Sequence, residues 1–186
     1  MRLSEKEGKE LIKLARESIK SVFSNSLLKI DDNIKSRFDK KQGVFVTLSI
    51  KGELRGCIGY PEPVFQLYKA VVNAAKSAAF SDPRFNPLDK EDFKQVDIEL
   101  SVLTVPELIK VRDAKDYLNS IKVGEDGLII RSELSSGLLL PQVFTEYKCD
   151  IVKALEMTCK KAMLNKDEWK NLDNKIYKFQ AQIFKE

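Results

Sequence analysis

The chain has 186 residues, 43% of them hydrophobic, which is enough for the packed interior of one ordinary domain. Its 32 Lys and Arg residues exceed its 28 Asp and Glu residues, and the net charge of +4 is spread along the sequence. This distribution is typical of a solvated surface of mixed sign and does not demand a nucleic-acid partner. The abundance of Lys, Glu and Ile suits a thermophilic protein.

Three further features narrow the chemistry and the location. The chain has no His, which excludes Ser-His and Cys-His nucleophile pairs, His-based zinc sites and histidine acid-base catalysis. Cys57, Cys149 and Cys159 form no CxxC pair, so the sequence predicts neither a disulfide framework nor a metal site. No apolar run approaches the about 20 residues of a membrane span, and the start has no signal-like region. We therefore expect a soluble, cytoplasmic protein.

The first predicted element is a helix. Ser4 and Glu7 have the spacing of a capping box, in which each side chain accepts a hydrogen bond from the other residue's backbone. Apolar residues then recur at helical spacing, which predicts one face against the core. That face comprises Leu11, Leu14, Ala15, Ile19, Val22 and Phe23.

A strand is predicted over Gly43 to Ile50, because its residues alternate as a strand covered on one side does. The inward set is Val44, Val46, Leu48 and Ile50, and the outward set is Phe45, Thr47 and Ser49. Lys51-Gly52 after this strand indicates a hairpin.

The length of the hairpin loop decides which face carries Arg55 and Cys57. A two-residue loop would place both on the apolar face and bury the guanidinium. We therefore predict a three-residue loop, Lys51 to Glu53. Arg55 and Cys57 then lie about 7 Å apart on the polar face, beside Ser49 and Thr47. The core residues of the second strand are then Leu54 and Ile58.

The middle of the chain predicts a helix, a stiff loop and a strand. Pro61 and Pro63 precede an alanine-rich helix from Val64 to about Phe80. The two prolines of Ser81 to Pro87 stiffen the loop that follows. The next strand, 96–105, has Ile98, Leu100 and Val102 facing inward.

The remaining elements complete an α+β fold with mostly antiparallel sheet and packed helices, in one domain of residues 1–186. They are a short helix over 113–121, a turn at 124–127, a strand over 128–131, a turn at 135–137, a helix over 150–163 and a closing strand over 176–184 in which Tyr177, Phe179, Ala181 and Ile183 alternate.

Six motifs in this order make the chain resemble the AMME chromosomal-region (AMMECR) protein family. They are GVFVTL at 43–48, LRGCIG at 54–59, AAFSDPRFNPL at 78–88, IELSVLT at 98–104, GEDGLII at 124–130 and GLLLPQV at 137–143. The resemblance covers nearly the whole chain. It implies two lobes, a larger and a smaller, with LRGCIG near a cleft between them, but no established reaction. It also links the chain to a pathway shared with Memo-like and radical S-adenosylmethionine proteins.

The chain departs from the family pattern at two places. Met163 stands where the family has a helix-ending Gly, and Cys149 stands where a Trp is usual before Asp150. The first departure questions the conformation after that helix. The second makes Cys149 a poor choice for a family-wide role.

The LRGCIG motif supplies the first candidate residues. Cys57 is a candidate nucleophile, because a nearby guanidinium stabilises a thiolate, or it fills a gap in the core as free Cys commonly does. Arg55 is a candidate ligand contact, since its planar fork binds carboxylate or phosphate. Gly56 and Gly59 would keep the surroundings open to a ligand.

The DPRF loop and the LLLPQ segment supply the others. Arg84 contacts a ligand, or it pairs with Asp82 or Glu146 and stiffens its loop. Asp82 braces the loop or accepts a proton. The resemblance would place Gln142 as a ligand contact and Glu146 as a carboxylate near LRGCIG. Alternatively, Gln142 satisfies backbone groups and Glu146 is an exposed first-turn acid. The remaining thiol, Cys159, is interpreted as core.

Three functions follow from these residues. In the first, a cleft binds a small anionic molecule or a segment of a protein partner without covalent chemistry. In the second, an enzyme uses Cys57 with Arg55, Arg84 and a carboxylate, and its cofactor, if any, is unknown. In the third, the basic pI serves nucleic-acid binding, although no basic stripe supports it. The sequence favours binding over catalysis and ranks nucleic acid last.

Overall fold

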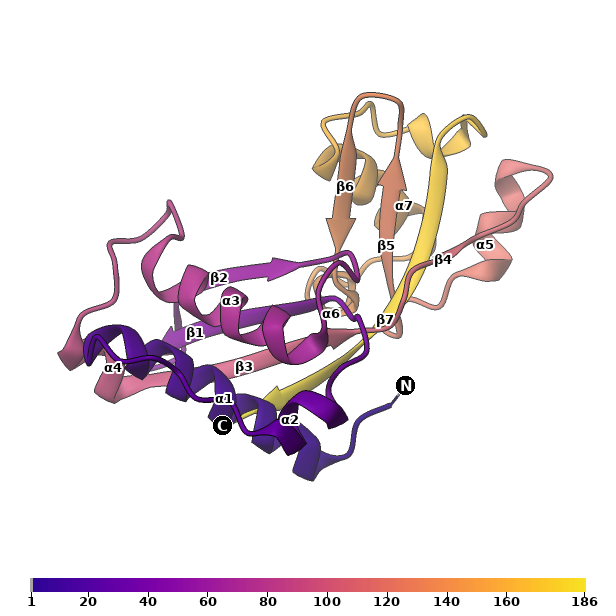
Figure 1. Cartoon of the computed structure of the whole chain (residues 1–186). Helices are drawn as coiled ribbons and strands as arrows, with labels where there is room; N and C mark the ends of the chain where they lie inside the picture. The colour runs from indigo at the N-terminus through magenta and orange to yellow at the C-terminus, as the bar shows by residue number, and fades with distance from the viewer. Residues whose placement is uncertain (1) are drawn as a thin grey trace. The chain divides into compact units, whose positions relative to one another are not determined.

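The computed structural model describes residues 2–186, which form two compact units (Figure 1). The first unit comprises the chain up to Leu103 together with Gln182–Glu186, and the second comprises Thr104–Ala181. The strand pairings of residues 44–60 with each other and with 96–102, and those of residues 126–131 with 136–139 and 175–180, are antiparallel, and helices accompany the strands in both units. The predicted α+β class is confirmed. No helix among residues 2–186 is both long and apolar enough to cross a membrane.

The first unit is a sheet with helices on one face. Its elements are α1 (Glu5–Phe23), α2 (Asp32–Arg37), β1 (Val44–Ile50), β2 (Glu53–Tyr60), α3 (Leu67–Phe80), α4 (Lys90–Gln95) and β3 (Val96–Leu103). β1 lies between β2 and β3, so β2 is an edge strand. α1 and α3 run side by side across these strands (Figure 1).

The helix predicted at the N-terminus is confirmed. Ser4 and Glu7 form both bonds of the capping box. The expected apolar face is buried except at its end, where Phe23 is partly buried and Val22 is 45% exposed. Val22 lies in the last turn, and periodicity alone cannot show how far the covering layer extends.

The core of the first unit lies between the sheet and these two helices. The inward residues predicted for β1 and β3 are buried, among them Val46, Leu48 and Leu100, except that Ile50 is partly buried. α3 begins at Leu67, three positions later than predicted, and its alanines face the sheet. Small side chains on α3 let the helix approach β2 closely, so that the carbonyl of Ala78 lies against Gly56.

The hairpin between β1 and β2 has a two-residue turn, so the predicted three-residue loop is wrong. Ile50 pairs with Glu53, which leaves Lys51 and Gly52 as the turn. Both have positive φ, 52° and 83°. This is the conformation that two-residue hairpins prefer, because it matches the twist of the strands.

A β-bulge follows this turn and corrects its register. Leu48 faces Gly56 while Ser49 faces Leu54, so Arg55 is an extra residue without a partner on β1. A bulge of this kind is common at sheet edges. One unpaired residue has the same effect on the register as one more residue in the loop.

The bulge makes part of the register prediction correct and part of it wrong. Thr47 pairs with Cys57, and Ile58 packs against the core, as predicted. Leu54, which was expected in the core, is 46% exposed. The reason is that Leu54 precedes the bulge and is therefore paired with Ser49 on the polar face.

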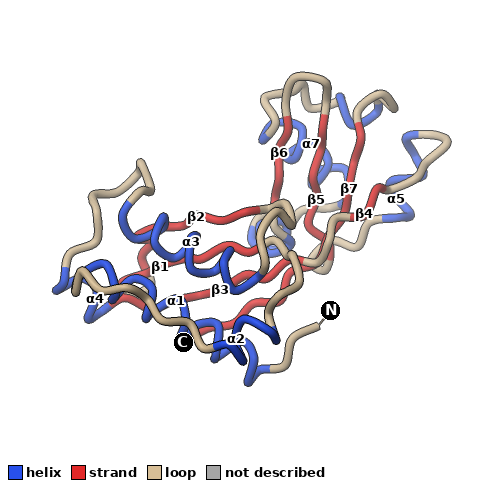
Figure 2. The backbone as a smooth tube through the Cα atoms, in the orientation of Figure 1, coloured by secondary structure: helices blue, strands red, loops and turns tan. Residues whose placement is uncertain are grey.

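The second unit is a smaller sheet covered by α7 (Figure 2). Its elements are β4 (Glu107–Leu108), η1 (Ala114–Asp116), α5 (Tyr117–Ser120), β5 (Asp126–Arg131), β6 (Ser136–Leu139), α6 (Pro141–Glu146), α7 (Ile151–Lys161), η2 (Glu168–Lys170) and β7 (Lys175–Lys185), whose last residues belong to the first unit. β5 pairs with β6 and β7, and β4 pairs with β7.

Three predictions for this part need correction. The turns expected at 124–127 and 135–137 both lie earlier, because Asp126 and Gly127 already belong to β5 and Ser136 and Gly137 to β6. The alternation expected in the closing strand is interrupted, since Ile176, Phe179 and Phe184 are its buried apolar residues. Ile176 lies in the core of the second unit and Phe184 in that of the first, so one alternation cannot hold along the whole strand.

The end of α7 shows what replaces the missing glycine. Met163 has φ of 60°, in the left-handed region that favours Gly, and is 95% exposed. Its backbone N–H donates to the carbonyl of Lys160, and that of Leu164 donates to the carbonyl of Cys159, both at 3.0 Å. The helix therefore ends in a glycine-type cap that is built with Met.

Candidate functional site

The outer edge of β2 is covered at Cys57 by side chains from the loop after α3. The Cys57 backbone N–H donates to Oδ2 of Asp82 at 2.8 Å. The Cys57 carbonyl accepts from Nη2 of Arg84 at 3.1 Å. The two side chains therefore take the place of the neighbouring strand that an edge strand lacks.

Asp82 is a buried carboxylate whose two oxygens are both occupied. Oδ1 accepts from the backbone N–H of Arg84 and from its Nε, at 3.1 and 3.0 Å. Oδ2 accepts from the Cys57 backbone N–H and from Nη2 of Arg84. The Arg84 hydrogen bonds hold the pKa of this carboxyl far below its usual range, against the opposing effect of burial. These contacts favour the bracing role over proton acceptance.

Arg84 is held in one position while much of its side chain stays in solvent. Its guanidinium bonds Asp82 through Nε and Nη2, and the side chain is 54% exposed. The Asp82 hydrogen bond raises the pKa of Arg84, and the adjacent Cys57 raises it further. None of these contacts uses Nη1, so a fixed guanidinium retains donors.

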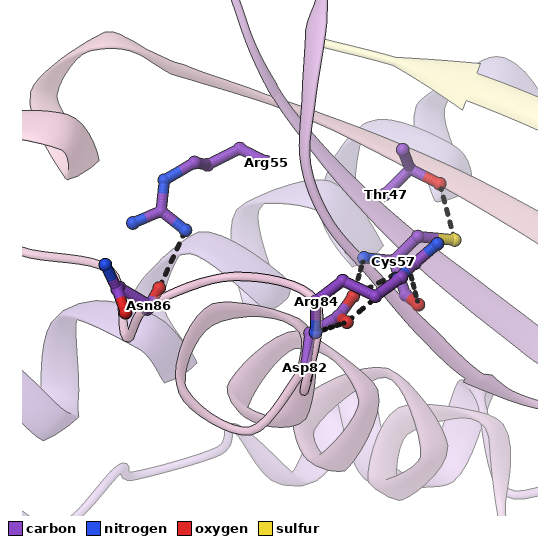
Figure 3. Close-up of polar contacts among 6 residues, drawn as sticks. All are labelled: Thr47, Arg55, Cys57, Asp82, Arg84 and Asn86. Atoms are coloured by element: carbon purple, nitrogen blue, oxygen red, sulfur yellow. Dashed lines mark hydrogen bonds and ion pairs between the residues drawn. The ribbon is translucent and has the colours of Figure 1, made fainter.

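The Cys57 thiol lies beside two polar groups (Figure 3). Its Sγ accepts a hydrogen bond from Oγ1 of Thr47 at 3.3 Å. The guanidinium of Arg84 lies at the same residue, since its Nη2 donates to the Cys57 carbonyl. The thiol is partly buried and does not lie in the apolar core.

Arg55 does not lie beside Cys57, and this expectation is wrong. Figure 3 shows its side chain directed toward Asn86, away from the thiol. Nη1 donates to the carbonyl of Asn86 at 2.8 Å, and Nε donates to Oδ2 of Asp92 at 3.1 Å. Nη2 adds a 3.4 Å bond to the carbonyl of Pro87. The bulge is the cause, because it releases Arg55 from the alternation of the strand.

The two glycines of LRGCIG are covered, not open as expected. A Cβ at Gly56 would overlap the carbonyl oxygen of Ala78 on α3. A Cβ at Gly59 would overlap the ring of Phe45, its cross-strand partner. Close packing therefore accounts for both glycines without a ligand.

Gln142 and Glu146 lie on α6 in the second unit, so their position relative to Cys57 stays a prediction. Oε1 of Gln142 is buried and has no hydrogen-bond partner among residues 2–186. Glu146 is exposed and is the last residue of α6. The alternative of a first-turn acid is therefore wrong, because the helix begins five residues earlier, at Pro141.

The other two thiols have different surroundings. Cys159 is fully buried, as predicted, and burial raises its pKa to about 11. Cys149 is partly buried and donates to Sδ of Met157 at 3.4 Å. Of the three, Cys57 alone has both a hydroxyl donor and a guanidinium beside it.

Sequence reasoning placed Thr47 beside Cys57 but did not make Thr47 a candidate residue, and it assigned the neighbouring guanidinium to Arg55 instead of Arg84. The outward alternation of β1 could have identified Thr47, since it predicted that Thr47 shares a face with Cys57. No local signal connects Arg84 to Cys57, because the two are 27 positions apart and meet only through the fold.

An antiparallel α+β fold with a loop-braced LRGCIG strand defines a class of proteins by structure and not by reaction. The AMMECR1 family model matches residues 12–184, and the chain belongs to this family.

Three relatives illustrate the match. A protein of Methanothermobacter thermautotrophicus is 48% identical over 99% of this chain and 96% of its own length. Protein MJ0810 of Methanocaldococcus jannaschii is 45% identical over 99% of this chain and 92% of its own. The crystal structure of the uncharacterized protein PH0010 from Pyrococcus horikoshii is similar with a TM-score of 0.91, at 40% identity, over 100% of this chain and 94% of that one.

Proposed function

We propose that the protein is a binding module that holds an anionic group at Arg84, beside Cys57 and Thr47. One observation carries the proposal: Arg84 is fixed by the buried Asp82 while 54% of its side chain is exposed. A guanidinium that is already fixed loses little conformational freedom on binding, which favours affinity. Its unused nitrogen matches a carboxylate or a phosphate.

This proposal moves ligand contact from Arg55 to Arg84. All three nitrogens of the Arg55 guanidinium group already have partners in the 86–92 segment. Its side chain is also only 19% exposed. The donors of Arg55 therefore hold the 86–92 segment, whereas Arg84 is the arginine that we propose contacts the ligand.

Binding is favoured over catalysis because of Asp82. A general base needs a free lone pair and a pKa near the working pH, whereas both Asp82 oxygens are occupied and its pKa is strongly lowered. An enzyme would need another carboxylate, such as Glu146, near Cys57. The anionic group can belong to a small molecule or to a protein segment, and Memo-like and radical S-adenosylmethionine proteins are the partners that the family context suggests.

Inorganic phosphate is a suitable first probe, with chloride at equal ionic strength as the reference. Nitrogen-15 NMR of the Arg side-chain Nε–H and of the Cys57 amide would follow the titration. We expect saturating shifts at Arg84 and Cys57, which Arg84→Lys abolishes. Arg112→Lys is the matched control, because Arg112 is exposed and lies in the second unit.

Shifts of equal size at Arg84 and Arg112 would indicate only general anion screening and would overturn the proposal. An absence of any shift at Arg84 would do the same.

A further inference from the structure

The outer edge of β6 is open, in contrast to the braced edge of β2. β6 is the last strand of its sheet, so no described strand lies on its outer side. The backbone N–H of Ser132 donates to the carbonyl of Ser135, which makes these two residues a hydrogen-bonded pair. Because such pairs alternate along an antiparallel ladder, Ser136 and Leu138 direct their N–H and C=O groups outward. An extended chain can pair with these groups.

A hollow of about 860 Å³, here called the hairpin hollow, lies beside the turn between β5 and β6, within the second unit. Its walls are the turn 132–135, the segment 162–164 after α7 and residues of 171–175. Figure 1 shows the β5–β6 turn and the loops that follow α7 at the same end of this unit. Leu134 and Met163, which line the hollow, are 97% and 95% exposed. The hollow therefore offers apolar surface to a binding partner.

The charges of the hairpin hollow favour a cation. Its ionisable lining residues are Glu133, Asp173 and Lys175. The Lys175 ammonium donates to the carbonyl of Leu172 at 3.0 Å, whereas the carboxylates of Glu133 and Asp173 have no hydrogen bond or ion pair among residues 2–186. The basic residues in the last turn of α7 precede the lining segment. A side chain with an apolar stem and a cationic end, as in Arg and Lys, is complementary to these walls.

Gly137 connects the open edge to the hollow. It lies between Ser136 and Leu138 and faces α7, since a Cβ there would overlap the backbone of Ala162. Residues opposite each other on paired strands share a face of the sheet, so a residue docked opposite Gly137 directs its side chain toward the segment 162–164. One extended segment can thus pair with β6 and place a basic side chain in the hollow.

We propose that β6 and the hairpin hollow dock an extended segment of a protein partner, with an Arg or Lys side chain of that segment in the hollow. β6 has only four residues, so its hydrogen bonds alone would bind weakly, and the apolar and ionic contacts of the hollow add to them. This interaction surface lies in the second unit, whereas Arg84 lies in the first, so either proposal can fail without the other.

The conformation of Met163 supports a binding role for this surface. Its φ of 60° is strained for a residue other than Gly, yet its side chain is exposed in the wall of the hollow. Strained residues of this kind are frequent at binding sites. Met163→Gly should therefore weaken docking although it relieves the strain.

The first test adds the peptide acetyl-Thr-Val-Arg-Val-Thr-amide to the full chain and follows hydrogen exchange of the β6 amides by NMR. We expect the amides of Ser136 and Leu138 to exchange fast in the free protein and about fivefold more slowly with the peptide. The amides of Gly137 and Leu139 are internal controls, because they already bond β5 and should change little. Unchanged exchange at Ser136 and Leu138 with millimolar peptide would overturn the proposal.

The second test replaces the peptide's Arg by citrulline, which keeps the shape and removes the charge. We expect the affinity, followed by the amide shifts of Leu134 and Met163, to fall about fivefold. The double variant Glu133→Gln, Asp173→Asn should bind the two peptides equally. Glu107→Gln is the matched control, because Glu107 is exposed on β4 and does not line the hollow. Equal affinity of the wild type for both peptides would refute the cation site.

The third test concerns the apolar wall and the folding of the variants. Met163→Gly should weaken both peptides alike, by about threefold, and keep the preference for Arg over citrulline. Unchanged affinity in Met163→Gly would contradict the role of this wall. Melting temperatures would show that each variant folds. Should the double variant not fold, the comparison of the two peptides on the wild type decides.

Discussion

The edge of β2 and the end of α7 satisfy backbone groups by different means. At the edge, charged side chains of Asp82 and Arg84 bond the backbone of Cys57. At the end of α7, the backbone of Met163 closes the cap and adopts a left-handed conformation to do so. The side-chain contacts at the edge leave the Nη1 donors of a fixed Arg84 guanidinium unused. The cap at the end of α7 leaves no such donor and strains the backbone of Met163. A side-chain brace can therefore also serve as a site.

The largest expected effect comes from breaking the brace. Asp82→Ala removes a buried carboxylate that accepts from both Cys57 and Arg84, so the free energy of unfolding should fall by about 3 kcal/mol. Urea unfolding would measure the change. Asp97→Asn, at an exposed position of β3, should leave stability nearly unchanged. Equal effects in both variants would refute the brace.

Acid should weaken the same brace. The pKa of Asp82 is lowered in the folded state, so its carboxylate contributes stability that is fully present above its unfolded pKa of about 4. This contribution is lost as the pH falls from there toward the folded pKa. The stability difference between wild type and Asp82→Asn should therefore stay constant between about pH 7 and pH 5 and shrink below about pH 4. A difference that grows on acidification would have the wrong sign.

Arg55 sharpens the comparison, because it braces without being exposed. Arg55→Lys keeps one charge but cannot bond Asn86, Pro87 and Asp92 together, so we expect a loss of about 1 kcal/mol. The same variant should leave the phosphate shifts at Arg84 unchanged. Thermal unfolding and the NMR titration would check the two halves. Unchanged stability with lost phosphate binding would return Arg55 to the site.

The smallest effect should be a gain at the end of α7. Met163→Gly removes the left-handed strain of a residue that is 95% exposed, so stability should rise by about 1 kcal/mol. Met163→Ala is the control, because it shortens the side chain but keeps the strain. Chemical unfolding would compare them, and a gain of the same size for Ala would show that strain is not the cause.

Patterns among neighbouring residues predicted much of the fold. The candidate site depends on contacts between residues far apart in the sequence, which such patterns do not predict. The Ser4 capping box and the alternation of β1 concern neighbours in sequence, and both are confirmed. The bulge at Arg55 is a feature of the pairing between β1 and β2, and the residue types of the hairpin alone did not predict it. The contact between Arg84 and Cys57 requires the end of α3 to reach the edge of β2. Residue types thus identified candidates, and tertiary packing decided their roles.

Hydrogen exchange at the Cys57 amide tests the central claim most directly, namely that Asp82 and Arg84 replace a neighbouring strand. The amide faces away from β1, and its bond to Asp82 at 2.8 Å should protect it despite its place on an edge strand. We predict slow exchange in the wild type and much faster exchange in Asp82→Ala, while the amides of the buried strand β1 remain protected. Fast exchange of Cys57 in the folded wild type, or protection that survives Asp82→Ala, would contradict the account.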